Sequence, residues 1–232
     1  MDKLGKFCKV PYTLINGRYR PYLEIIFHNP KINKSTSKTF AMVDSGADHT
    51  VIPFSMGKLI GLDDPNEAEV LANVSGVGGN LSYIQRDCNI YLTNQLKKEI
   101  YVFKETVWWI YPDKNTLDEQ KRLIDEFTNF NNLQQQCKPD TELFKHFQIQ
   151  QNLTIAKLSG ISNKLETGIL LGRPFFDNFE FIQFLHKDRN QEDKCYFNYK
   201  VKNSKIIETL PTQQSPSVNQ VQVKIGAVGK KI

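Results

Sequence analysis

One stretch of the sequence brings together residue types that can cleave a peptide bond with water. The apolar run Phe40–Val43 leads directly into Asp44-Ser45-Gly46, and a β-branched run, Thr50–Ile52, follows. This order predicts two strands joined by a tight turn, with one carboxylate at the tip of a loop between apolar walls. Such a carboxylate can act if a second one lies close to it. Two carboxylates about 3 Å apart cannot both ionise, so the protonated one polarises the carbonyl of a peptide bond while the ionised one accepts a proton from water. The alternative interpretation is an ordinary Asx-type turn, because Asp-Ser-Gly is also common turn chemistry.

Three glycines mark a second candidate feature, Gly76-Val77-Gly78-Gly79. Residues typical of strands flank them in Val70–Val74 and Leu81–Ile84. Glycine leaves room for a close backbone approach, so the segment predicts the tip of a hairpin that can fold over a ligand. A plain flexible turn is an alternative interpretation. A phosphate-binding loop is a poorer one, because G-x-x-x-x-G-K-S/T is absent and no helical pattern follows directly.

A third feature lies much later in the chain, where the apolar Ile169-Leu170-Leu171 ends in Gly172-Arg173. Pro174 then suits the first turn of a short helix. In this order, the acid loop, the glycine-rich hairpin and the Leu-Leu-Gly-Arg segment resemble the retropepsin-like aspartic proteases. The resemblance covers roughly residues 10 to 200, and the combination is more specific than any one segment alone.

The resemblance implies a role for each matching residue. Asp44 would be the catalytic acid, Ser45 would grip the opposite loop of a partner subunit, and Gly46 would contact the main chain of the substrate. Asp48 and Arg173 match positions that pair near the subunit contact, with a structural role first and a substrate-facing role second, and Gly172 would be structural too. The substrate-binding residues would be Ala47, Asp48, Gly76, Val77, Gly78 and Gly79.

The chain carries one convincing acid loop, whereas a two-lobed aspartic protease carries two. The nearest second candidate, Leu165–Gly168, has Glu166 in place of the aspartate and is expected inside the strand that leads to Gly172. Activity would therefore require a homodimer in which each subunit contributes Asp44 at the two-fold axis.

Three functions are compatible with these residues. The leading expectation is an aspartic endopeptidase that acts on a peptide or protein substrate and uses no cofactor and no metal. The alternative is a catalytically idle fold of the same family that serves as a dimerisation or peptide-binding module. Serine hydrolysis through Ser45 is a weaker third idea, because the Gly-x-Ser-x-Gly context is absent.

Composition and charge narrow the possible partners. A length of 232 residues suits one well-packed domain with additions, or at most two small domains, and a hydrophobic content of 40% is that of a globular protein. The net charge of +5 comes from 30 basic and 25 acidic residues that are interspersed, so no nucleic-acid partner is expected. Met1–Phe7 lacks an apolar signal core, and no later run approaches the ~20 apolar residues of a membrane helix. We therefore expect a soluble, cytosolic protein without a membrane partner.

The cysteines predict no metal site and no disulfide framework. Cys8, Cys88, Cys137 and Cys195 are far apart and form no C-x-x-C pair, and the histidines are scattered among them. Reduced, packed thiols are the expectation.

The expected fold is mainly β, a single-lobe, homodimeric acid-protease fold within residues 1–210, followed by a polar, flexible tail at 211–232. Asn16-Gly17 between two β-rich runs predicts a hairpin. Pro53–Leu62 predicts a short helix that stops at Gly61. A terminal hairpin is expected from 179–184 and 195–199.

A helical insertion is expected at about 112–158. Thr116–Glu119 has the form of a capping box, and Pro139-Asp140 opens a second amphipathic stretch. The insertion is either a lid that buries its apolar face against the sheet or a partner-binding site. Just before it, one of Trp108 and Trp109 is expected to face inward and the other to cover an edge.

Overall fold

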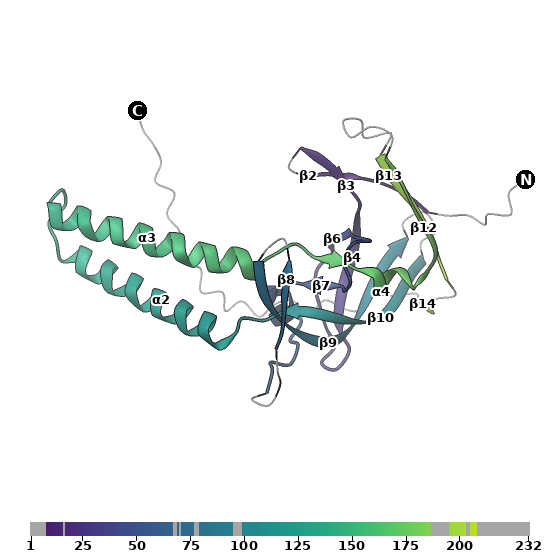
Figure 1. The fold of residues 1–232 in the computed structure, drawn as a ribbon, viewed down its shortest axis with the longest axis horizontal. Helices are drawn as coiled ribbons and strands as arrows, with labels where there is room; N and C mark the ends of the chain where they lie inside the picture. The colour runs from purple at the N-terminus through teal and green to yellow at the C-terminus, as the bar shows by residue number, and fades with distance from the viewer. Residues whose placement is uncertain are drawn as a thin grey trace, which may run out of the picture.

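The computed structural model describes residues 8–15, 17–66, 69, 71–76, 79–94, 99–186, 195–202 and 205–207. Its centre is a closed, mixed β-barrel of six strands (Figure 1). In the order in which they pair, the strands are β10 (Glu99–Ile110), β7 (Val51–Ile52), β11 (Leu170–Leu171), β6 (Thr39–Val43), β4 (Tyr22–Asn29) and β9 (Gly79–Asn94). Pairing between β9 and β10, from Asn94 opposite Glu99 to Tyr83 opposite Ile110, closes the ring.

The alternation of side chains along β10 explains how the barrel forms its core. Phe103, Val107 and Trp109 are buried, whereas Lys104 is exposed. Successive residues of a strand point to opposite faces, so these apolar side chains share the inward face. Glu105 occupies the same inward face and is buried with them.

The short strand β11 lies between the two strands that flank the predicted acid loop. It runs parallel to β6, with Leu170 opposite Met42 and Leu171 opposite Val43. On its other side, Leu170 pairs with Val51 of β7 in the antiparallel sense. The acid loop therefore leaves the sheet on one side of β11 and returns on the other, which brings the late Leu-Leu-Gly-Arg segment next to it.

A second sheet, of three strands, packs against the same core. It consists of β1 (Cys8–Pro11), β13 (Cys195–Val201) and β12 (Phe179–His186), and the pairing of β12 with β13 confirms the predicted terminal hairpin. The hairpin predicted around Gly17 is also confirmed, because β2 (Thr13–Ile15) pairs with β3 (Arg18–Arg20). Three further strands, β5 (Lys34–Ser35), β8 (Ala72–Gly76) and β14 (Lys205–Ile207), pair with β4, β9 and β10 respectively.

The short helices have the predicted positions. Helix α1 (Phe54–Leu59) begins after Pro53, and the chain reverses at Gly61, whose φ of +63° favours glycine. Helix α4 (Arg173–Phe176) has its proline in the first turn. One half of the prediction for the two tryptophans is confirmed, because Trp109 faces inward and is fully buried. Trp108 is half-buried and stacks on the ring of His49, and the edge-covering role predicted for it is not tested.

Two long helices, α2 (Lys114–Gln135) and α3 (Glu142–Leu165), form a hairpin that projects away from the barrel (Figure 1). Their facing sides pack against each other, with Leu123 fully buried. The helical insertion is thus confirmed, although α3 continues past the predicted end near 158 to Leu165, which is buried against the rest of the fold.

The start of each long helix also differs from the prediction. The N-cap of α2 is Asp113, whose side chain accepts a hydrogen bond of 2.7 Å from the amide of Thr116, so Thr116 is not the cap itself. The N-cap of α3 is Thr141, which accepts from the amide of Phe144 at 3.2 Å, and Asp140 before it has a positive φ. Both caps supply an oxygen to amides that have no partner within the helix.

The structure is therefore strand-rich, as predicted, and mixed α/β because of the helical hairpin. None of the helices in the described residues is long and apolar enough to cross a membrane. The predicted tail at 211–232 lies outside the described residues, and the homodimer remains a prediction.

Candidate functional site

The Asp44 loop is a tight turn that is fixed by its own backbone. Asp44 follows β6, and its amide donates to the carbonyl oxygen of Leu171 at 3.0 Å. Its carboxylate oxygen Oδ1 accepts from the amide of Gly46 at 2.9 Å, and its carbonyl accepts from the amide of Ala47 at 3.2 Å. Asp44 as a whole is half-buried. It is therefore held in one orientation while part of it stays open to a ligand.

The segment after β11 supports this loop from the side. The amide of Arg173 donates to the carbonyl of Ala47 at 2.9 Å, and the guanidinium of Arg173 forms an ion pair with Asp48. The side chains of this pair are 65% and 64% exposed, so solvent screens the pair and its contribution to stability is small. The sequence-predicted pairing of Asp48 with Arg173 is thus present within one chain, and its role at a subunit contact stays a prediction.

A cavity of about 710 Å³ opens beside Asp44. Of the predicted site residues, Asp44, Gly46, Ala47 and Asp48 line it, whereas Ser45 is exposed. The remaining lining comes largely from apolar and aromatic side chains, which are Tyr22, Met42, Val51, Leu81, Tyr83, Trp108, Ile169 and Leu170. An apolar cavity with a few polar groups on one wall is the usual form of an organic ligand site.

The glycine-rich hairpin adjoins this cavity. Strands β8 and β9 pair from Ala72 opposite Tyr83 to Gly76 opposite Gly79, and Val77 and Gly78 at the tip lie outside the described residues. Further down the hairpin, Leu81 and Tyr83 line the same cavity as Asp44. The acid loop, the Leu-Leu-Gly-Arg segment and the base of the glycine-rich hairpin therefore meet in one place.

Two features of the cavity wall were not predicted from the sequence. The ring of His49 stacks on Trp108 with 3.9 Å between centroids and 8° between planes, and Tyr83 lies 5.8 Å from the same tryptophan. Arg20 also lines the cavity, and its guanidinium lies 3.7 Å from the sulfur of Met42. No short-range sequence pattern predicts these contacts, because they join residues that are far apart in the chain.

A third unpredicted feature is a buried hydrogen bond behind the loop. The hydroxyl Oγ1 of Thr50 donates to Oε1 of Glu105 at 3.0 Å, and both residues are buried. Burial raises the pKa of the Glu105 carboxyl, the hydroxyl of Thr50 lowers it, and the negative charge of Asp177 raises it. The alternation along β10 was a signal that could have identified Glu105, since it shares the face of Phe103 and Val107.

The second acid loop considered in the sequence was wrongly placed. Glu166 does not lie in a strand but caps the C-terminus of α3, and β11 begins later, at Leu170. Its carboxylate accepts hydrogen bonds from the amide of Ser55, at 3.1 Å, and from the hydroxyl of Ser55. Glu166 therefore connects the helical hairpin to α1, and it is not among the residues that line the Asp44 cavity.

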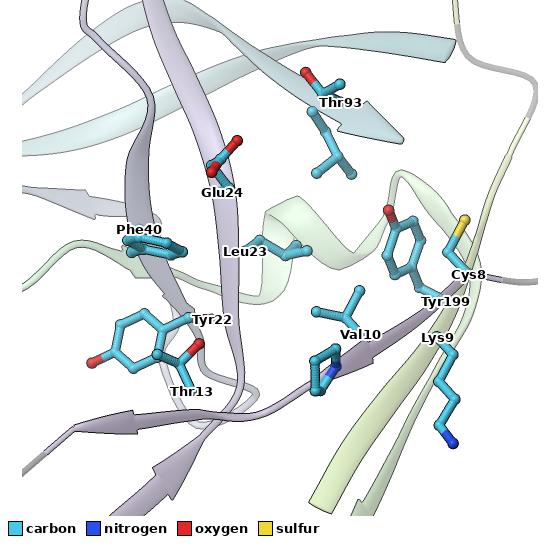
Figure 2. Close-up of a pocket in the computed structure, with 12 residues that line it drawn as sticks. Cys8, Lys9, Val10, Thr13, Tyr22, Leu23, Glu24, Phe40, Thr93 and Tyr199 are labelled. Atoms are coloured by element: carbon cyan, nitrogen blue, oxygen red, sulfur yellow. The ribbon is translucent and has the colours of Figure 1, made fainter. Parts of the chain in front are cut away.

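Another cavity, of about 390 Å³, lies between the three-stranded sheet and the barrel (Figure 2). Cys8 and Tyr199 line one side of it and Glu24 the other. Burial raises the pKa of Tyr199, and Glu24 forms an ion pair of 2.7 Å with Lys38. A phenol that keeps its proton and a carboxylate that is already paired with a lysine make this cavity a poorer candidate for hydrolysis than the one beside Asp44.

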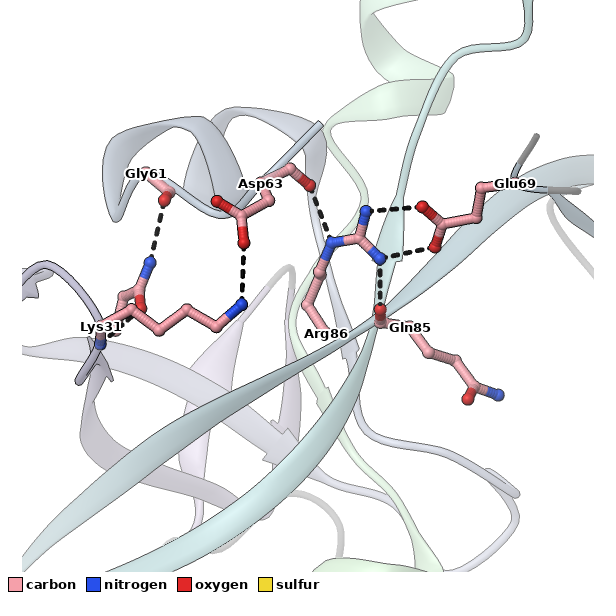
Figure 3. A network of polar contacts seen from close by, with 7 residues as sticks. Lys31, Gly61, Asp63, Glu69, Gln85 and Arg86 are labelled. Carbon is pink, nitrogen blue, oxygen red and sulfur yellow. Dashed lines mark hydrogen bonds and ion pairs between the residues drawn. The ribbon is translucent and has the colours of Figure 1, made fainter. Parts of the chain in front are cut away.

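A polar network anchors the connection between α1 and the glycine-rich hairpin (Figure 3). Arg86 of β9 donates to both carboxylate oxygens of Glu69, at 2.7 and 3.0 Å, and to the carbonyl of Asp63 at 2.7 Å. The hydrogen bond from Arg86 lowers the pKa of Glu69. Lys31 pairs with the carboxylate of Asp63 at 2.8 Å. The network fixes the base of the hairpin and leaves its tip out of these contacts.

Within the part of the chain that the structure describes, no group of three or more His, Cys, Asp or Glu side chains is arranged to hold a metal ion. No protein-family model and no curated protein sequence matches the chain significantly.

Proposed function

We propose that the chain is a retropepsin-like aspartic endopeptidase that acts as a homodimer. The observation that carries the proposal is the orientation of the Asp44 carboxylate. It is held by the amide of Gly46 at the edge of an apolar cavity that the base of the glycine-rich hairpin also lines. A catalytic carboxylate needs both properties, a fixed geometry and a cavity that takes an extended peptide.

In the proposed dimer, each subunit contributes one Asp44 at the two-fold axis. The ionised carboxylate takes a proton from water, and the water oxygen attacks the carbonyl carbon of the peptide. The protonated carboxylic acid of the partner meanwhile donates to the carbonyl oxygen. When the tetrahedral intermediate collapses, the C–N bond breaks and the leaving amine takes up the proton that the first carboxylate accepted from water. The partner carboxylate takes a proton back from a hydroxyl group on the same carbon, which restores the starting state. Ser45 and Gly46 are exposed in the single chain, which suits contact with the opposite loop and the substrate.

The alternative function is a peptide-binding or dimerisation module without catalysis. One observation favours it: of the described residues that line the cavity, two are acids, and one of these, Asp48, is already paired with Arg173. A single subunit thus offers one unpaired carboxylate, and a dyad requires the partner. A chain that remained monomeric would bind peptides without cleaving them.

A cleavage assay on a mixed peptide library, run beside sedimentation equilibrium, separates the two functions. Asp44→Asn is the test variant, and Asp87→Asn is the matched control because Asp87 lies on β9, bonds to Thr106 and does not line the Asp44 cavity. We expect cleavage to follow the dimer fraction and to fall at least about 100-fold in Asp44→Asn. Cleavage that survives in Asp44→Asn contradicts the proposal, and a stable monomer that binds peptides intact supports the alternative.

A further inference from the structure

The loop that carries Asp44 returns to the barrel at Thr50, and this residue joins three segments. Its carbonyl accepts from the amide of Trp108 at 2.8 Å. Its hydroxyl donates to Glu105 at 3.0 Å and accepts a longer contact of 3.4 Å from the amide of Gly172. Thr50 thus connects β10 to the Leu-Leu-Gly-Arg segment, whose residue Leu171 in turn holds the amide of Asp44 at 3.0 Å.

The hydroxyl of Thr50 can accept the contact from the amide of Gly172 in only one orientation. A hydroxyl has one proton and two lone pairs, so donation to Glu105 leaves a lone pair free to face the amide of Gly172. Without an acceptor at residue 105, the hydroxyl proton is free to rotate toward other acceptors, including nearby backbone carbonyl groups. The carboxyl of Glu105 therefore fixes both the rotamer of Thr50 and the direction of its lone pairs.

A carboxyl group in this position is costly for the fold. Glu105 is only 6% exposed, and the described residues include no Lys or Arg that forms an ion pair with it. Its neighbours on the inward face of β10 are Phe103 and Val107, so an apolar residue fits the local pattern better. Residues that break the local pattern in this way are expected at functional sites.

We propose that Glu105 is a positioning residue, which fixes the Asp44 loop by accepting the hydrogen bond of Thr50. Glu105 does not line the Asp44 cavity. Its effect passes through Thr50 to Gly172 and Leu171, and from there to the amide of Asp44. The role in catalysis rests on the proposed function, whereas the role in fixing the loop does not.

The test compares four variants at the two partners. Glu105→Leu and Thr50→Val remove the hydrogen bond, whereas Glu105→Gln keeps an acceptor oxygen and Thr50→Ser keeps the hydroxyl. The first readout is hydrogen exchange of the amides of Asp44 and Gly172, which needs no substrate. We expect both amides to exchange about tenfold faster in Glu105→Leu and in Thr50→Val, and at nearly the wild-type rate in Glu105→Gln and Thr50→Ser.

The second readout is the cleavage of peptides. In Glu105→Leu and Thr50→Val, displacement of the Asp44 loop should lower kcat by about tenfold while KM changes less than about twofold. Glu105→Gln should keep a kcat close to that of the wild type. Thr154→Val is the matched control, because Thr154 is also buried but its hydroxyl bonds within α3, to the carbonyl of Gln150 at 2.9 Å. It should leave both readouts unchanged.

Two results would overturn the proposal. One is wild-type exchange at Asp44 and Gly172 in Glu105→Leu, and the other is an equal effect of Glu105→Leu and Glu105→Gln. If Glu105→Leu does not fold, the comparison of Thr50→Val with Thr50→Ser tests the same hydrogen bond from the side of its donor. If the wild-type dimer cleaves no peptide, the proposed function fails, while the exchange rates still decide the role of Glu105.

Discussion

The backbone of Gly172 is in direct contact with the backbone of His49, which belongs to the returning half of the acid loop. A β-carbon at residue 172 would lie 2.3 Å from the carbonyl oxygen of His49 and 2.8 Å from its amide nitrogen. Both distances are well below van der Waals contact, and neither atom belongs to a side chain that can rotate away. The Leu-Leu-Gly-Arg segment and the acid loop can approach this closely because residue 172 is glycine.

Replacement of Gly172 by alanine should therefore displace the loop. We expect Gly172→Ala to lower the free energy of unfolding by about 1–3 kcal/mol, as overpacking does in other cores. We also expect it to reduce peptide cleavage at least about tenfold, because the displaced backbone adjoins Asp44. Urea unfolding and the peptide assay measure the two effects.

Gly168→Ala is the matched control for this prediction. Gly168 lies on the same segment and lines the same cavity, but a β-carbon there has no neighbour within 4 Å. Its stability should stay within about 0.5 kcal/mol of the wild type. Equal stability losses in the two variants would show that the contact with His49 is not the cause.

The pH dependence of cleavage tests whether the two Asp44 carboxylates share one proton. A pair that needs one ionised and one protonated member gives a bell-shaped rate profile, and we expect its optimum on the acid side of neutrality. The measurement is kcat/KM for one peptide over a pH series in which sedimentation shows that the dimer persists. A rate that keeps rising through about pH 9 contradicts a shared proton.

The sequence predicted those parts of the site that depend on local order. Asp44-Ser45-Gly46 forms a turn because residues of these three types favour turns. Gly172 follows the end of β11, where glycine is also favoured. The contact between Thr50 and Glu105 depends instead on how β7 and β10 align, with Val51 opposite Trp108. Strand periodicity gives the face on which Glu105 lies, but only the pairing register gives its partner.

The same distinction explains the helical hairpin. Apolar periodicity correctly predicted two helices, since it depends on neighbours three and four residues apart. It ended α3 too early, because Leu165 is buried by the rest of the fold and Glu166 is held by Ser55, far away in the sequence. Helix ends that are fixed by such tertiary contacts have no local signal.

Stability against pH gives an independent test of the buried carboxyl of Glu105. Burial raises its pKa in the folded state, so between the unfolded and the folded pKa the native state binds more protons. The stabilising contribution of the protonated group is complete below the unfolded pKa, near the ordinary glutamate pKa of 4.5, and is lost as the pH rises through the folded pKa. We expect Glu105→Gln to be more stable than the wild type at neutral pH and to lose this advantage toward about pH 4. Urea unfolding across this range measures the difference.

Glu69→Gln should change the pH dependence of stability in the opposite direction to Glu105→Gln. The hydrogen bond from Arg86 lowers the pKa of Glu69, so its contribution to stability is present above the unfolded pKa and is lost as the pH falls through the folded pKa. Glu69→Gln should thus be less stable than the wild type at neutral pH and should approach it in acid. If the stability difference between variant and wild type changes in the same direction with pH for Glu105→Gln and Glu69→Gln, burial is not what sets the pKa of Glu105.

Two glycines in helices should respond to alanine in opposite directions. Gly57 of α1 is buried, and a β-carbon there would lie 2.1 Å from Cε2 of Trp109. Trp109 has no room to move, because it is fully buried and its indole nitrogen donates to the carbonyl of Phe54 at 3.0 Å. Gly160 of α3 is exposed, and a β-carbon there has no neighbour within 4 Å.

Alanine favours the helical conformation by up to about 1 kcal/mol over glycine, so Gly160→Ala should raise the free energy of unfolding by roughly this amount. In Gly57→Ala the same gain is outweighed by the overlap with Trp109, and we expect a net loss of about 1–3 kcal/mol. Urea unfolding of both variants beside the wild type measures the difference, and tryptophan fluorescence reports any displacement of Trp109. A stabilised Gly57→Ala would contradict a steric overlap between the β-carbon of residue 57 and Trp109.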